Sequence, residues 1–335
     1  MPELPWKPWI SALTLRPEVQ KDDITLSLFA ASLYDAVMDK GSVMYRDPAE
    51  FFGLTYTTNS LRDLARDVLQ RLAGKNDRSV RQLALTYGGG KTHALLTLYH
   101  LVNDPAKLPR QSASVDRILS AAGMRTAEGP PRARVAILPF DQIDVEKGME
   151  ARSPSGAVRR FKLPWSLLAW QLGGEEAMAA LGGPEDGERL SPPATNVLTE
   201  ILGFPARNGL ATLILIDEVI LWARTMFGLD PEWGNRIQDF FQYLTQAAAG
   251  VDRCAIVASI LANDPKSNDE KGRELARRLE EVFRRGSEQS VEPVAKEDVA
   301  QVLRRRFFTP DSTSDTEKFV ARADEALVGV TKLNK

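Results

Sequence analysis

Apolar residues along this chain follow two alternating patterns. Short apolar runs rich in Val, Ile and Leu predict strands that are buried on both faces, at about 80–85, 134–140, 208–216 and 254–261. Apolar residues at helical spacing predict helices at about 23–38, 61–72, 91–102, 164–172, 233–250, 269–284 and 297–308. Strands that alternate with helices indicate an α/β fold, in which a parallel sheet lies between two layers of helices.

A glycine-rich turn separates the first predicted strand from the helix that follows it. Its sequence, Tyr87-Gly-Gly-Gly-Lys-Thr-His93, has the strand–glycine–lysine–helix layout of a phosphate-binding loop. Glycines let backbone N–H groups approach a polyphosphate, and a helix N-terminus adds donors and a partial positive charge. Lys91 is expected to contact the β- and γ-phosphates, and the hydroxyl of Thr92 to hold Mg²⁺. The match to the usual motif is partial, because Leu85 stands where the first glycine is expected.

The loop residues predicted to contact a nucleotide are Tyr87, Gly88, Gly89, Gly90, Lys91, Thr92 and His93. Three glycines crowded at 88–90 leave the phosphate-binding chemistry in place, while the first turn of the loop differs from the common form. For His93, a packed or capping side chain is the competing interpretation.

Two carboxylates end the apolar run at 208–216. Ligands of open parallel sheets bind at the carboxyl ends of strands, where Asp217 and Glu218 stand. Asp217 is predicted to hold Mg²⁺, and Glu218 to accept a proton from the attacking water. Together with Lys91 they supply the positioning and charge that phosphoryl transfer needs. A helix cap at the strand end is the structural alternative for this acidic pair.

Two further polar groups are expected near the phosphates. Ser259, at the end of the fourth predicted strand, is the first choice for orienting the water, and Asn263 is the second. An arginine is expected to complete the neutralisation of the γ-phosphate, and the candidates are Arg285 and its neighbour Arg284, which close a charged helix. A solvated helix face is the competing interpretation for both arginines.

Basic and aromatic residues are interleaved in the segment 141–196, which we interpret as an insertion with one helix. The basic residues Arg159, Arg160 and Lys162 lie near Phe161, Trp165 and Trp170. Such interleaving is typical of single-stranded nucleic-acid binding, in which bases stack on aromatic rings. A packed helix with a basic edge is the competing interpretation.

Composition and charge limit the classes of function. The formal net charge is −2 at pH 7, which argues against a large nucleic-acid footprint. The single cysteine excludes an intrachain disulfide and, with only two histidines, a structural zinc site of the usual N/S type. The sequence shows no signal-peptide pattern and no apolar run long enough to span a bilayer, so a cytoplasmic protein without membrane contact is predicted.

Longer stretches of the sequence resemble the domain-of-unknown-function 499 family over about residues 20–310. The stretches are Phe51-Phe-Gly-Leu-Thr-Tyr, Tyr87-Gly-Gly-Gly-Lys-Thr-His, Pro164-Trp-Ser-Leu-Leu-Ala-Trp-Gln-Leu, Leu215-Ile-Asp-Glu-Val and Ile256-Val-Ala-Ser-Ile-Leu-Ala-Asn-Asp-Pro. That family is similar to AAA+-type P-loop ATPases and is found in bacterial phage-defence gene islands, often beside DNA methyltransferases. The resemblance implies a three-layer α/β/α P-loop NTPase of AAA+/ASCE type, ATP and Mg²⁺ as cofactors, and a sensor role for Ser259.

These patterns divide the chain into three predicted regions. Residues 1–58 are expected to form an N-terminal arm and helical segment, and residues 59–294 the P-loop ATPase core that contains the insertion. Residues 295–335 are expected to begin a helical lid. Since members of the family are usually much longer, the chain is expected to be a truncated or N-terminal portion.

Three functions are left open by the sequence. The first is a Mg-ATP-hydrolysing ATPase in an anti-phage system of the DNA modification or restriction type, with proteins such as a DNA methyltransferase as partners. The second is a nucleotide-binding switch or scaffold with negligible turnover, suggested by the missing first glycine. The third is a DNA-handling motor, supported by the basic edge at 159–162 and by Arg304-Arg305-Arg306. Contact with DNA and formation of a homo-oligomer are left open as well.

Overall fold

The structure of the protein is a computed structural model that describes residues 14–16, 19, 31–83, 90–125, 127–183, 188–259, 270–286 and 290–309. The chain divides into two compact units. The larger one comprises residues 31–53 and 57–295, and the smaller one residues 1–30, 54–56 and 296–335. All the residues predicted to act on a nucleotide belong to the larger unit.

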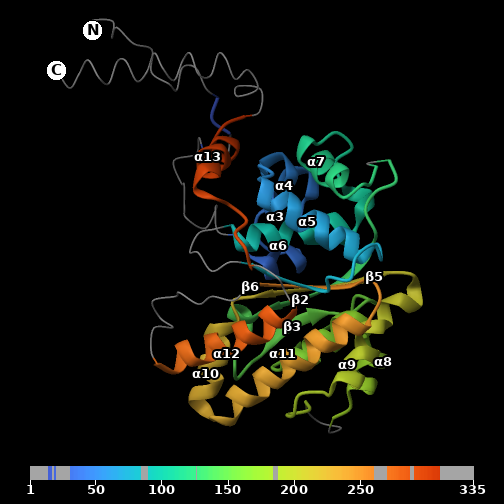
Figure 1. The fold of residues 1–335 in the computed structure, drawn as a ribbon, viewed down its shortest axis with the longest axis vertical. Helices are drawn as coiled ribbons and strands as arrows, with labels where there is room; N and C mark the ends of the chain where they lie inside the picture. Colours follow the sequence, from blue (N-terminus) through green and yellow to red (C-terminus); the bar gives the residue numbers. More distant parts are fainter. Residues whose placement is uncertain are drawn as a thin grey trace, which may run out of the picture. The chain divides into compact units, whose positions relative to one another are not determined.

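A five-stranded parallel sheet forms the middle of the larger unit (Figure 1). Its strands lie in the order β2-β5-β6-β1-β7, with the bounds β1 (Val80–Leu83), β2 (Ala133–Pro139), β5 (Ala211–Asp217), β6 (Cys254–Ser259) and β7 (Ser290–Val291). Every residue of β5 and β6 is buried, as expected for strands that are covered on both faces. The predicted α/β fold with a parallel sheet is confirmed.

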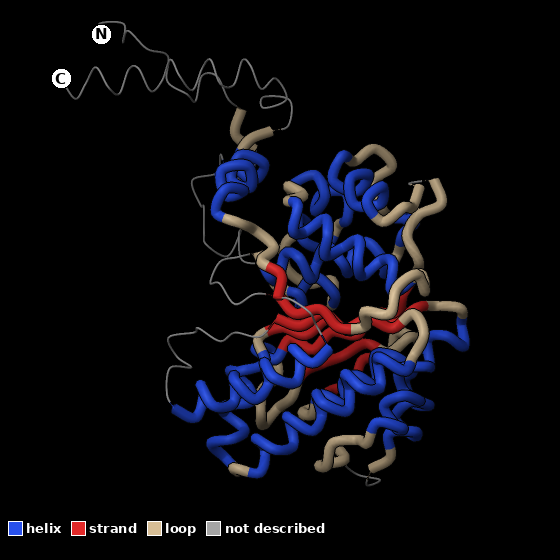
Figure 2. The backbone as a smooth tube through the Cα atoms, in the orientation of Figure 1, coloured by secondary structure: helices blue, strands red, loops and turns tan. Residues whose placement is uncertain are grey.

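Helices cover both faces of this sheet, as Figure 2 shows. One layer contains α2 (Leu33–Val37), α3 (Val43–Arg46), α4 (Pro48–Leu54), α5 (Asn59–Leu72), α6 (Lys91–Asn103) and α7 (Ala113–Ala121). The other contains α8 (Pro164–Leu181), α9 (Thr195–Gly203), α10 (Val219–Leu229), α11 (Glu232–Gly250) and α12 (Glu270–Gly286). Side chains of β5 alternate between two cores: Ile214 packs with the second layer, and its neighbour Leu215 packs with the first. The apolar run of β5 therefore joins all three layers.

Helix α10 is the clearest element that the sequence pattern does not predict. Its segment begins with the almost continuously apolar run Val219-Ile-Leu-Trp-Ala223, in which no helical period stands out. The insertion also contains an unpredicted antiparallel hairpin, formed by β3 (Met149–Arg152) and β4 (Val158–Phe161). None of the described helices is long and apolar enough to cross a membrane.

The tryptophans of the insertion lie in the core and not at the surface. Trp165 and Trp170 are buried, and the ring centroid of Trp165 lies 6.1 Å from that of Trp233. The guanidinium of Arg159 lies over the rings of Phe161 and Trp170. Stacking of nucleic-acid bases on these tryptophans is therefore wrong as an interpretation. The competing interpretation is confirmed for the packed helix, whereas the basic residues Arg159 and Arg160 lie on β4.

The outer edge of β2 is covered by a side chain where a further strand could otherwise add. The N–H of Ile137 donates to Oε1 of Gln171 (3.0 Å), and Nε2 of Gln171 donates to the Ile137 carbonyl (2.9 Å). One side-chain amide of α8 thus makes the two hydrogen bonds that a neighbouring strand would make at this residue. Covering an edge in this way limits unwanted pairing with other chains.

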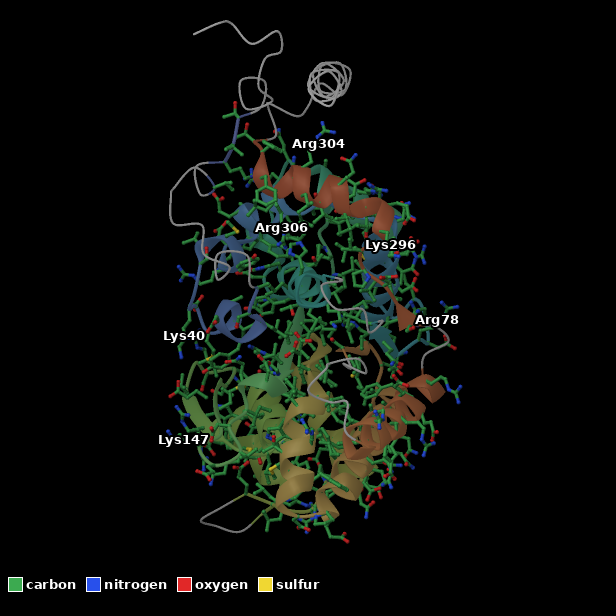
Figure 3. The ribbon with its side chains drawn as sticks, turned by 90° about the vertical axis from the view of Figure 1, so that its left-hand side faces the viewer. Lys40, Arg78, Lys147, Lys296, Arg304 and Arg306 are labelled. Atoms are coloured by element: carbon green, nitrogen blue, oxygen red, sulfur yellow. The ribbon has the colours of Figure 1, made fainter. Side chains whose placement is uncertain are left out.

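In the smaller unit, residues from distant parts of the chain pair with each other. Leu15 forms an antiparallel bridge with Phe308, which follows the helix α13 (Val299–Phe307). This helix agrees with the one predicted at the end of the described chain, and Arg304 and Arg306 project from it (Figure 3). The apolar pattern also predicts a helix near 314–328, which lies outside the described residues.

Arg71, in the last turn of α5, connects this helix to the sheet. Its guanidinium is buried and donates from Nε to the Cys254 carbonyl (2.9 Å). Its Nη2 donates to the carbonyls of Val251 (2.9 Å) and Ala248 (3.2 Å). These partners lie at the end of α11 and the start of β6, so one side chain ties three elements together.

We expect Arg71→Ala to lower the free energy of unfolding by about 3 kcal/mol, because several buried carbonyls lose a charged donor. The free energy of unfolding of Arg71→Lys should lie between those of Arg71→Ala and the unmodified chain, since an ammonium cannot reproduce the planar fork of the guanidinium. Urea titration measures both. Arg78→Ala is the control, because Arg78 lies at the surface (Figure 3) and its 3.7 Å ion pair with Asp67 should contribute less than about 1 kcal/mol. Equal losses for the two alanine variants would contradict the role of Arg71.

Candidate functional site

The predicted chemical groups gather at one edge of the sheet. Asp217 is the last residue of β5, and Ser259 is the last residue of β6, the strand between β5 and β1. Leu83, the last described residue before the glycine-rich turn, pairs with Ser259. Because the strands are parallel, their carboxyl ends meet at this edge. Helix α6 starts with Lys91, after the glycine-rich turn that follows β1.

Gly90 is the first described residue after the glycine-rich turn, since Tyr87, Gly88 and Gly89 lie outside the described residues. Its backbone has φ 73° and ψ 22°, in the left-handed region, where it caps the start of α6. A Cβ atom at this position would come within 2.9 Å of Cγ2 of Val294. Both the backbone conformation and the lack of space therefore require glycine here.

A hydrogen bond joins the start of α6 to the acidic strand. The hydroxyl of Thr92 donates to Oδ2 of Asp217 over 3.0 Å, across 125 residues of sequence. It brings together the two side chains that the sequence assigns to a metal ion. The other oxygen of Asp217, Oδ1, is buried and has no hydrogen-bond partner among the described residues. A buried carboxylate oxygen without a partner indicates a place for an ion, a water or a ligand.

Lys91 and Asp217 are ionisable groups that are withdrawn from water. They are only 8 % and 4 % exposed. Burial lowers the pKa of Lys91, while the negative charges of Asp217 and Glu218 raise it. Burial raises the pKa of Asp217 to about 6, against the opposing effect of the hydrogen bond from Thr92. The site therefore holds a cation near two carboxylates in surroundings that disfavour charge.

Ser259 lies beside the Asp217 carboxylate at the end of β6. The side chain is fully buried, and its hydroxyl lowers the pKa of Asp217. Its Oγ nevertheless makes no hydrogen bond of normal geometry within the described part of the chain. A hydroxyl in this position can turn toward a water or a phosphate oxygen, which is what the orienting role predicted for Ser259 requires.

Glu218 follows Asp217 in a strained backbone conformation. Its φ is 53° and its ψ is 44°, in the left-handed region that residues other than glycine adopt rarely. Such a conformation costs on the order of 1–2 kcal/mol, and strain of this kind is concentrated at functional sites. The strained turn takes the chain from β5 directly into α10, with Glu218 partly exposed at the edge where Asp217 lies.

Asp141 is a further acidic group that the sequence pattern does not single out. It lies in the short 3-10 helix Phe140–Gln142, directly after β2, and accepts a 2.6 Å hydrogen bond from Nε2 of Gln142. Desolvation and then the charge of Asp35 raise the pKa of Asp141, although the residue is exposed to solvent. The charge of Asp141 in turn raises the pKa of Asp217. The one signal in the sequence is an acidic residue just after a buried strand.

The remaining residues predicted for the site are His93, Asn263, Arg284 and Arg285. The ring of His93 stacks on Phe51, with centroids 4.5 Å apart. Arg284 and Arg285 lie in the last turn of α12, where Arg284 is exposed. The side chain of Arg285 and the whole of Asn263 lie outside the described part of the chain.

A family model described as the DUF499 N-terminal domain matches residues 12–291. Neither a curated protein nor a solved structure matches the chain. The matched range includes the whole parallel sheet and every residue predicted to act on a nucleotide.

Replacement of Asp217 by asparagine should stabilise the protein at neutral pH. A carboxyl group whose pKa rises from 3.8 to about 6 on folding binds more protons folded than unfolded, so its contribution to stability falls as the pH rises from about 4 to 6. The shift corresponds to about 3 kcal/mol. We expect Asp217→Asn to raise the free energy of unfolding by about 2–3 kcal/mol at pH 7.5 and by little at pH 4, measured by urea titration. The exposed control Glu146→Gln should change neither value, and an equal effect of Asp217→Asn at both pH values would contradict the burial penalty.

Substitutions at Glu218 test the strain in the turn after β5. Asparagine tolerates the left-handed conformation, so Glu218→Asn should raise the free energy of unfolding by about 0.5–1 kcal/mol. The β-branched variant Glu218→Val should lower it by at least about 1 kcal/mol. Thermal and urea unfolding of the two variants measure the difference, and the opposite order of stability would exclude a strained native backbone.

Proposed function

The chain belongs to the DUF499 family, and we propose that it is a P-loop ATPase of AAA+/ASCE type that binds and hydrolyses Mg-ATP. The observation that carries this proposal is the 3.0 Å hydrogen bond between Thr92 and Asp217, with the unpartnered Asp217 oxygen beside it. It joins the start of the helix after a glycine–lysine loop to the end of an acidic strand. P-loop nucleotide sites use a hydroxyl and an aspartate from these two places to hold magnesium.

The order of the strands supports the ASCE form of this fold. One strand, β6, lies between β1, which leads to the lysine loop, and the acidic strand β5. A polar residue on the strand beside the acidic one is expected to orient the attacking water, and β6 is that strand. Ser259 stands at its end, between the lysine loop and Asp217.

The residues present fit a magnesium ion. Mg²⁺ prefers oxygen ligands, keeps several waters and usually binds through one or two protein groups together with substrate phosphates. Thr92 and Asp217 offer a hydroxyl and a carboxylate oxygen of this kind. In the described ranges, no group of three or more His, Cys, Asp or Glu side chains could hold a metal ion by itself. When bound, Mg²⁺ supplies charge neutralisation at the β- and γ-phosphate oxygens.

Lys91 and the start of α6 bind the phosphates in this proposal. Burial lowers the pKa of the Lys91 amine, and a polyphosphate beside it favours the charged ammonium. The first backbone N–H groups of α6 have no partners within the helix and point toward its start. The ammonium and these donors together hold the phosphates at the edge where the acidic residues lie.

Glu218 accepts the proton of the attacking water, and Ser259 orients that water. The strained turn fixes Glu218 next to Asp217 while leaving it accessible to solvent. A positioned base of this kind typically accelerates a reaction by about 10²–10⁴-fold. Arg285, in the last turn of α12, completes the neutralisation of the γ-phosphate, at its own site or at that of a neighbouring copy.

The family resemblance supports a place for this ATPase in the bacterial cytoplasm, in defence against phage together with proteins such as a DNA methyltransferase. A nucleotide-binding switch without turnover is the second candidate, and Leu85 in the position of the first loop glycine favours it. A DNA-handling motor has less support, because the tryptophans beside the basic edge are buried and Arg160 is paired with Glu150 at 2.8 Å.

Three variants of the full chain test the proposal by calorimetry with Mg-ATP and by phosphate release, with and without DNA. Lys91→Ala should weaken Mg-ATP binding by at least about tenfold, since it removes a charged hydrogen bond to phosphate. Glu218→Gln should keep the binding and lower turnover by at least about 100-fold. The exposed Lys75→Ala is the matched control and should change neither.

Turnover that is the same in Lys91→Ala, Glu218→Gln and the unmodified chain would overturn the ATPase proposal. Tight Mg-ATP binding by the unmodified chain, with no phosphate release in the presence or absence of DNA, would instead establish the switch.

A further inference from the structure

A cavity of about 190 Å³ lies along the outer edge of β2, away from the candidate nucleotide site. Its wall includes Tyr99 and Asn103 in the last turns of α6, whereas Lys91 and Thr92 stand at the start of that helix. Seven residues of helix separate Tyr99 from Thr92 by about 10 Å along the axis. One water needs only about 10–15 Å³, so the cavity has room for a small molecule.

The backbone of β2 presents unused hydrogen-bonding groups to this cavity. In a parallel sheet, the N–H and C=O groups of successive residues point to opposite edges of the strand. Ile137 uses its outer-edge groups on Gln171, so Val135, two residues earlier, presents its own N–H and C=O to the same edge. Val135 lines the cavity, and these two groups have no partner among the described residues. A buried backbone pair of this kind calls for a partner.

Arg134 places a positive charge without a counter-charge on the same wall. Within the described part of the chain, its guanidinium makes no hydrogen bond or ion pair. Burial lowers its pKa, and the charge of Arg132 lowers it further. The other charged groups of the wall are already paired: Glu150 lies 2.8 Å from Arg160, and Arg152 is bound to an aspartate. Arg134 is thus a partly exposed cation that can pair with an anion bound beside the cavity.

The opposite side of the cavity adds a hydroxyl and apolar surface. The Tyr99 hydroxyl accepts a 3.1 Å hydrogen bond from Nδ2 of Asn103. Burial raises the pKa of Tyr99 to about 12, so the hydroxyl keeps its proton and can donate it. Met38 and Met149 line the cavity as well. A small ligand with one charged end and an apolar or amide body matches this combination.

We propose that this edge cavity binds a small carboxylate that also carries an amide group, of the size of an acylated amino acid. The carboxylate pairs with the guanidinium of Arg134, whose planar fork matches its two oxygens. The amide pairs with the N–H and C=O of Val135, as one residue of an added strand would. This assignment does not rest on the ATPase proposal, because it uses none of the residues of that site.

N-acetylglycine is the probe, and its binding to the full chain is measured by ligand-detected NMR. We expect saturable binding in the millimolar range. Arg134→Met should weaken this binding at least about tenfold, because a charged hydrogen bond is lost. Lys91→Ala should leave it unchanged. Urea titration of Arg134→Met should give at least the stability of the unmodified chain, since the guanidinium has no partner to lose.

Several results would overturn the proposal. The first is the absence of saturable binding of N-acetylglycine, and the second is binding that survives Arg134→Met. The third is binding that is lost in Lys91→Ala, which would assign the anion to the lysine loop. Equal affinity for the neutral N-acetylglycinamide would exclude the role of the carboxylate. Equal affinity for inorganic phosphate would exclude the role of the amide. A failure of Mg-ATP binding bears on none of these outcomes.

Discussion

The burial of the Asp217 carboxylate is the constraint around which the candidate site is arranged. It ends a strand of which every residue is buried, and burial raises its pKa to about 6. An acid kept in such surroundings costs stability at neutral pH. The large apolar cores on both faces of β5 offset that cost, and the hydrogen bond from Thr92 reduces it. A strand this deeply packed holds its last residue in a fixed position, as the metal-binding role proposed for Asp217 requires.

The same constraint explains why the turn after Asp217 is strained. The chain must leave a fully buried strand and enter the helix α10, whose first two residues are buried, without a connecting loop. Glu218 absorbs the change of direction in a left-handed conformation. Its side chain is thereby kept at the carboxyl edge of the sheet, where its charge acts on Lys91 at the start of α6. The strained backbone of Glu218 therefore follows from the direct connection between the tightly packed strand β5 and the helix α10.

The edges of the sheet show how the protein satisfies polar groups where strand pairing ends. Arg71 satisfies carbonyls where β6 begins, and Gln171 satisfies Ile137 on the outer edge of β2. Two residues away on the same edge, the N–H and C=O of Val135 have no hydrogen-bond partner among the described residues, and Val135 lines the cavity. Arg134, which lines the same cavity, has a guanidinium without a partner among the described residues. The outer edge of β2 is thus covered at Ile137 and, among the described residues, open at Val135, beside a charged side chain.

The sequence by itself determined the strands, most of the helices and the chemical groups of the loop and the acidic strand. Strands buried on both faces must be continuously apolar, and a phosphate-binding turn needs glycine and lysine side by side, so both leave local signs. Only the tertiary structure decided that Thr92 meets Asp217 across 125 residues. It also brought Asp141 to the site, buried Trp165, and left Arg134 unpaired. Such contacts depend on strand order, register and packing between distant residues, and the local pattern of apolar and polar positions records none of these.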